Sequence, residues 1–122
     1  MFKSTITFSS KELSAKERVK FKDLSDAMQL DEATQNSHVD IYPDFYVELH
    51  VENDKADTKE YDKLVIVDGD GNKWVTGSES FKRAFSDIAE EMGGESEPWG
   101  IRCFKKPSKN YKGKDFLTCT II

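Results

Sequence analysis

Five lysines crowd one short stretch near the end of the sequence, between two strand-like segments. They are Lys105, Lys106, Lys109, Lys112 and Lys114. Tyr111 lies among them, and Asp115 is the one acid of the stretch. Lysines neutralise phosphates without needing a fixed geometry, and a tyrosine ring can stack on an unpaired base. The pattern favours contact with single-stranded nucleic acid; a solvated loop whose lysines only aid solubility is the alternative.

Strand alternation adds candidates beside this stretch. If Ile101 and Cys103 face the core, then Arg102 and Phe104 face outward, because successive side chains of a strand point to opposite faces. We assign Trp74 to the same outward group, as a stacking ring beside Phe104. The alternative is that these rings pack under the N-terminal segment or a partner subunit. A register shift of one residue would invert the assignment.

The remaining polar residues do not form a recognisable catalytic or metal motif. His38 and His50 are single, with no cysteine or histidine at metal-ligand spacing, and are expected to be structural. Asp68 to Asn72 resembles the start of a calcium loop, but Lys73 stands where that loop needs glycine. A hairpin turn is therefore expected there. We predict a non-enzymatic protein with no catalytic residues, no metal and no cofactor.

Periodicity then predicts the elements that position these residues. Residues 81–92 place apolar side chains at helical spacing, after serines that can cap a helix and before Gly93 and Gly94. Alternating apolar and polar residues predict strands elsewhere. These strands are expected at residues 2–9, 45–52, 61–67, 73–76, 99–105 and 116–122, and the lysine-rich stretch joins the last two as a hairpin loop. Residues 10–43 have mixed patterns, with a capping-box spelling from Ser14 to Glu17.

This order predicts a mainly β fold. Five strands with one helix between the third and fourth match the connectivity of an OB-like barrel, a fold that often binds oligonucleotides. We expect one domain over residues 1–122, in which 1–43 form an N-terminal extension and 44–122 the barrel.

Composition is consistent with one domain. The chain has 122 residues, 37% of them hydrophobic, with a net charge of −5, so positive charge is local rather than general. The bases at Lys11, Lys16, Arg18, Lys20 and Lys22 either extend a basic track or, as we prefer, form a solvated face.

Cys103 and Cys119 are expected to be buried thiols. No signal peptide or membrane span is recognised, so we expect a cytoplasmic protein, in the host cytoplasm if phage-encoded.

Two segments resemble small single-stranded DNA-binding proteins of phages and conjugative elements of Gram-positive bacteria. They are Lys73-Trp-Val-Thr-Gly-Ser-Glu-Ser-Phe81 and Pro107-Ser-Lys-Asn-Tyr-Lys-Gly-Lys-Asp-Phe116, and the segments 11–18 and 30–34 are similar to the same family. The resemblance implies an OB-type fold, homo-oligomers and a role in replication or recombination. Familiar members recruit replication or recombination proteins through an acidic tail; the strand-like residues 120–122 make that recruitment doubtful here.

The expected partner is therefore single-stranded DNA or RNA, bound with little sequence preference, and no membrane is involved. The alternative is a protein-interaction module of the same fold that engages a host protein. The segment from Glu52 to Gly71, with seven acids and three lysines, would suit a basic partner.

Overall fold

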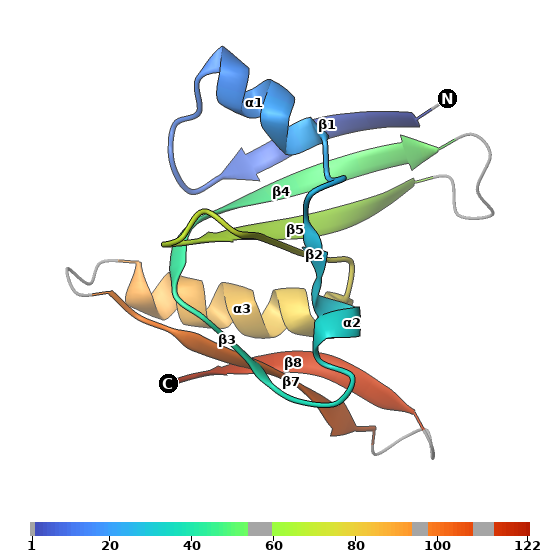
Figure 1. Cartoon of the computed structure of the whole chain (residues 1–122), viewed down its shortest axis with the longest axis vertical. Coiled ribbons are helices and arrows are strands. Elements are labelled where there is room, and N and C mark those ends of the chain that lie inside the picture. Colours follow the sequence, from blue (N-terminus) through green and yellow to red (C-terminus); the bar gives the residue numbers. More distant parts are fainter. Residues whose placement is uncertain (1, 54–59, 94–97, 109–113) are drawn as a thin grey trace. The chain divides into compact units, whose positions relative to one another are not determined.

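The computed structural model describes residues 2–53, 60–93, 98–108 and 114–122 of the chain (Figure 1). Eleven helices and strands are assigned in them. In chain order they are β1 (Phe2–Ser9), α1 (Ala15–Lys22), β2 (Met28–Gln29), α2 (Leu30–Ala33), β3 (Val39–Ile41), β4 (Pro43–Asn53), β5 (Glu60–Asp68), β6 (Lys73–Thr76), α3 (Glu79–Met92), β7 (Ile101–Pro107) and β8 (Asp115–Ile121).

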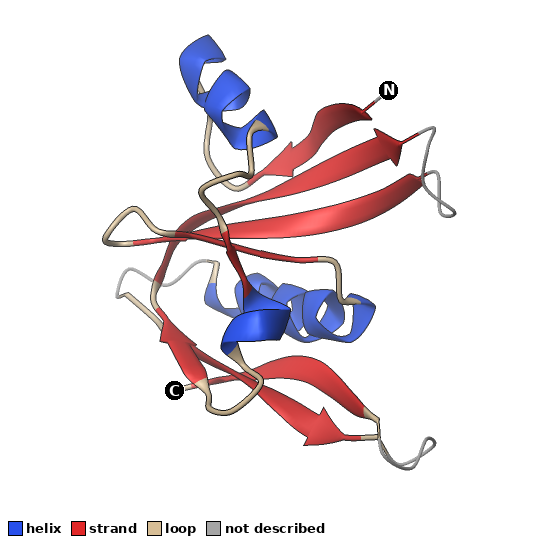
Figure 2. Cartoon of the chain, turned by 45° about the vertical axis from the view of Figure 1, so that its right-hand side comes forward, coloured by secondary structure: helices blue, strands red, loops and turns tan. Residues whose placement is uncertain are grey.

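The predicted mainly β class is confirmed, and the strands form two sheets (Figure 2). One sheet has the order β1-β4-β5-β6-β2 and the other the order β3-β7-β8. Across the described ranges the two sheets do not close into a barrel, so the five-stranded OB-like barrel stays a prediction. No helix of the described residues is long and apolar enough to cross a membrane.

The chain divides into two compact units. The first comprises Met1–Met28 and Asp44–Gly77, and the second comprises Gln29–Pro43 and Ser78–Ile122. The predicted boundary after Pro43 therefore coincides with a change of unit, but the N-terminal 43 residues contribute to both units.

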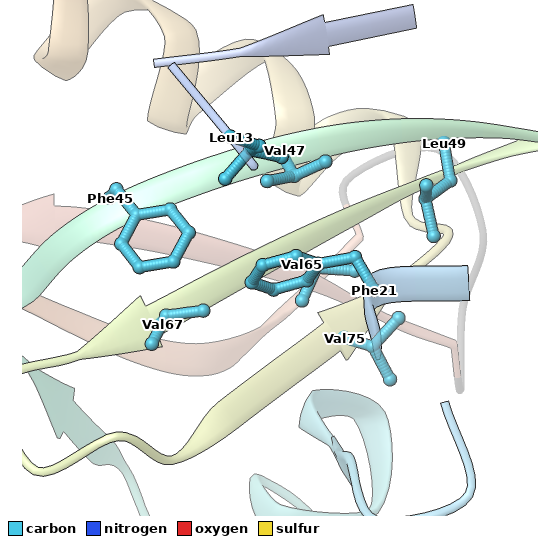
Figure 3. Packing of buried hydrophobic residues seen from close by; sticks show 8 residues of the cluster. All are labelled: Leu13, Phe21, Phe45, Val47, Leu49, Val65, Val67 and Val75. Carbon is cyan, nitrogen blue, oxygen red and sulfur yellow. The ribbon is translucent and has the colours of Figure 1, made fainter. Parts of the chain in front are cut away.

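The first unit is built on the five-stranded sheet. Its largest strands bury Phe45, Val47 and Leu49 from β4 and Val65 and Val67 from β5 on one face (Figure 3). Leu13, Phe21 and Val75 complete this cluster. Leu64 to Val67 are buried at every position, so β5 has both of its faces covered.

Helix α1 supplies Phe21 to that cluster and begins at the capping-box residues, in a region whose structure the sequence left open. The Ser14 hydroxyl accepts a hydrogen bond from the Glu17 backbone N–H at 3.2 Å, and the Glu17 carboxylate accepts one from the Ser14 N–H at 3.1 Å. The two bonds satisfy backbone donors that a helix start leaves unpaired. They also hold the pKa of Glu17 below its usual range.

The second unit places α3 against one face of the three-stranded sheet (Figure 1). Phe81, Phe85 and Ala89 lie on one stripe of the helix and are buried, as the helical spacing predicts. Ser78 accepts a hydrogen bond from the Phe81 N–H and caps the helix. The Ser80 hydroxyl donates to the Leu117 carbonyl at 2.8 Å, which ties the start of α3 to β8.

Candidate nucleic-acid interface

Strands β7 and β8 have one buried face and one outward face. Ile101 and Cys103 of β7, and Leu117 and Cys119 of β8, are buried. Cys103 and Cys119 are register partners and remain free thiols. The inward assignment is therefore confirmed for these four residues, but Ile121, which the same alternation assigns inward, is 44% exposed. The intervening residues lie on the other face.

The outward face of this hairpin alternates rings and cations. Its register pairs Phe104 with Thr118 and Lys106 with Phe116, so both rings and the lysine occupy one face. The two phenylalanines are half-buried, and Lys106 is exposed. Phe104 and Phe116 are diagonal neighbours, a spacing that aromatic side chains can bridge.

Tyr42 is a third ring of this surface that the sequence analysis missed. It follows β3 directly and is 58% exposed. Its ring lies over Gly100, where an added Cβ would come within 2.6 Å of a ring carbon. A Cβ at this position would require the Tyr42 ring to move, and glycine permits the close approach without that movement. The sequence alone could not place Tyr42 opposite Gly100, because this contact depends on the pairing of β3 with β7.

Arg102 lies on the same face but already has a carboxylate partner. Its Nε and Nη2 donate to the two carboxylate oxygens of Asp40 on β3 at 2.9 and 3.2 Å. The Asp40 hydrogen bonds raise the pKa of Arg102, and the Arg102 hydrogen bonds lower the pKa of Asp40. Arg102, predicted to bind phosphate, therefore also links β3 to β7. A phosphate would have to compete with Asp40 for some of the N–H donors of the Arg102 guanidinium.

Lys105, predicted as a phosphate contact, does not lie on the outward face. It lies within β7, in agreement with the strand predicted over residues 99–105, and its register partner is the buried Leu117. Its ammonium is 3.3 Å from the Asp31 carboxylate of α2, and only 24% of the side chain is exposed. Alternation along the strand sends Lys105 to the side opposite Phe104 and Lys106.

The described part of the hairpin ends close to its tip. The Ser108 N–H donates to the Lys114 carbonyl at 2.9 Å, which extends the ladder beyond Pro107 and Asp115. Lys106 and Lys114 are exposed near this end. The predicted contacts Lys109, Tyr111 and Lys112 lie outside the described residues and stay predictions.

Trp74, predicted as a stacking ring beside Phe104, belongs to the first unit. Trp74 is on β6, and its register partner is the buried Ile66 of β5. Its indole N–H donates to the Asp68 carboxylate at 3.1 Å. The same carboxylate accepts the backbone N–H groups of Asp70 and Asn72, both at 2.9 Å. Burial favours a higher pKa for Asp68, but these hydrogen bonds hold it below its usual range. The Asp68–Asn72 segment is thus the expected hairpin turn, with Gly71 at φ +87°, and Trp74 secures it.

Comparison with known proteins adds no relative to this description. No family model matches the chain, no curated protein matches it, and no solved structure matches it.

Proposed function

We propose that this chain binds single-stranded nucleic acid on the outward face of the β3-β7-β8 sheet. The observation that carries the proposal is the set of three rings, Tyr42, Phe104 and Phe116, on one face with Lys106. Rings supply sequence-tolerant stacking, worth about 1–3 kcal/mol per base. Lysines supply attraction to the phosphates, and Lys114 extends that attraction toward the tip.

Support for an OB-like arrangement comes from the strand that joins the two sheets. β3 and β4 are separated by Tyr42 alone, yet β3 pairs with β7 while β4 lies between β1 and β5. Pro43 has no N–H to donate, so it suits a break in pairing at this point. Strands that pass from one sheet to another through a bend make the corners of barrel-like folds.

A fluorescence titration tests the proposed binding. Trp74 and Trp99 report on the chain, and poly-dT is added at low and at high salt. We expect binding at low salt that weakens as salt is added, because each neutralised phosphate releases counterions. Tyr42→Ala should reduce the affinity about tenfold, the equivalent of roughly 1.4 kcal/mol.

Tyr42→Phe is the matched control, because it keeps the ring and removes only the hydroxyl. It should bind like the wild type. Equal affinity of Tyr42→Ala and the wild type would contradict the proposed surface, and no binding of poly-dT or poly-rU at low salt would contradict nucleic-acid binding altogether.

A protein partner is the second candidate function. The end of the β4–β5 pair carries several carboxylates, including Glu60 and Asp62, which are 63% and 59% exposed. A basic protein could bind such a surface by charge complementarity. Failure of the poly-dT titration together with capture of a basic host protein, lost in Glu60→Lys, would favour this function.

A further inference from the structure

Three side chains with metal-ligand chemistry converge on β4 and β5 of the first unit. His50 and Glu52 come from β4, and Glu60 comes from β5. One ligand atom from each lies within 4.8 Å of the other two. Ligand atoms held at about 2.1 Å around one tetrahedral ion lie about 3.4 Å apart. The side chains therefore need to close by up to about 1.4 Å, which side-chain rotation of the 63%-exposed Glu60 can supply in large part.

A fourth residue orients the imidazole of His50. Its Nδ1 lies 2.8 Å from the Asp62 carboxylate, while its Nε2 lies 3.7 Å from Oε1 of Glu60. In the neutral imidazole, an Nδ1–H that donates to Asp62 leaves Nε2 as the ring nitrogen with a free lone pair, 3.7 Å from Glu60. Histidines that bind metals commonly have this arrangement, in which a carboxylate holds the far nitrogen and sets the tautomer.

Carboxylates outnumber cations in this group, with Lys3 of β1 as the register partner of Glu52. Three carboxylates, those of Glu52, Glu60 and Asp62, surround one imidazole. Lys63 follows Asp62 in the chain, but its ammonium lies over the Tyr61 ring, 5.4 Å from the ring centroid. A divalent ion would offset the mutual repulsion of the carboxylates.

We propose that His50 Nε2 and the carboxylates of Glu52 and Glu60 bind a first-row divalent transition ion such as Zn²⁺, with Asp62 as a positioning residue. An imidazole nitrogen beside two carboxylate oxygens suits such an ion better than Ca²⁺ or Mg²⁺, which prefer oxygen ligands alone. This site uses residues of the first unit, whereas the proposed nucleic-acid surface uses residues of the second.

Calorimetric titration of the untagged full chain with ZnCl₂ tests the site. We expect saturable binding of one ion, loss of measurable binding in Glu60→Gln and His50→Ala, and a tenfold to hundredfold weaker affinity in Asp62→Asn. CaCl₂ should bind much more weakly than ZnCl₂. Thermal unfolding in EDTA checks that Glu60→Gln, a change at an exposed side chain, keeps the wild-type fold.

Asp70→Asn is the matched control, because it removes one carboxylate from the same unit at the 68–72 turn. It should bind ZnCl₂ like the wild type. The proposal is overturned if Asp70→Asn weakens binding as much as Glu60→Gln, if Glu60→Gln binds normally, or if the wild type binds no Zn²⁺ at millimolar concentration. Titration with CoCl₂ separates these ligands from Cys103 and Cys119: a thiolate charge-transfer band would also overturn the assignment.

Discussion

Two strand pairs of this chain carry opposite charge on comparable scaffolds. β4 and β5 are neighbours in the five-stranded sheet, and the end of that pair gathers carboxylates around His50. β7 and β8 are neighbours in the three-stranded sheet, and that pair carries Lys106 and Lys114 near its end. In both pairs, alternation along the strands decides which side chains share a face. The type of those side chains then decides whether the face suits a cation or a phosphate.

The pairs also differ in how their charges are balanced. In the β7–β8 pair, Arg102 and Lys105 each have a carboxylate partner, Asp40 and Asp31. In the β4–β5 pair, one imidazole faces several carboxylates. The first arrangement holds strands and α2 together. The second leaves an excess of negative charge that a bound ion would offset.

The largest expected effect concerns the thiols beneath the β7–β8 pair. Burial raises the pKa of both Cys103 and Cys119, that of Cys119 to about 12. Because the thiolate is the reactive form, the native protein should react with a disulfide reagent about a thousandfold more slowly than the unfolded chain. Labelling rates with and without urea measure the ratio. Rapid labelling of the native protein would show that the inner face of this pair is open.

Truncation of Phe81 should give the next largest effect. Its side chain is fully buried on α3, and removal of a buried phenylalanine ring leaves a cavity. Phe81→Ala should lower the free energy of unfolding by about 3–5 kcal/mol, measured by urea denaturation. Val19→Ala, at a 70%-exposed position of α1, should change it by less than about 0.5 kcal/mol. Similar losses in both variants would contradict the assigned core.

Reversal of one lysine charge on the β7–β8 strand pair should have a smaller effect. Lys106→Glu should reduce the affinity for poly-dT about tenfold and flatten its salt dependence, because fewer phosphates are neutralised. Lys16→Glu makes the same change on α1 and should have little effect. Equal losses would instead support the N-terminal basic track. Binding is measured by the tryptophan titration over a series of salt concentrations.

The smallest effect should come from the ion pair of Asp40 with Arg102. The hydrogen bonds from Arg102 lower the pKa of Asp40 in the folded state, so this carboxylate contributes stability above its unfolded pKa of about 4. The contribution is lost as the pH falls through the folded-state pKa. Asp40→Asn should therefore be slightly less stable than the wild type at pH 7 and equally stable in strong acid. Urea midpoints across this range provide the comparison, and a difference that grows in acid would contradict the sign.

Much of the local structure could be predicted because its causes are local. The strand at residues 2–9, the capping box at Ser14 and the helix over residues 81–92 follow from spacing and capping chemistry. The lysine-rich stretch was predicted less well. Alternation placed Arg102 and Phe104 on one face, but the predicted strand ended at Lys105, whereas β7 continues through Lys106 to Pro107.

The sequence by itself determined which residues alternate, where α3 begins, and that positive charge gathers near residue 105 while carboxylates gather between residues 52 and 71. Only the tertiary structure decided which charges are already paired. The partners of Arg102 and Lys105 lie 62 and 74 residues away in the chain, and Tyr42 meets Gly100 across two strands. Glu60 likewise approaches His50 only because β4 and β5 are neighbours. Periodicity acts within one strand or helix, whereas these contacts depend on which strands pair and in which register.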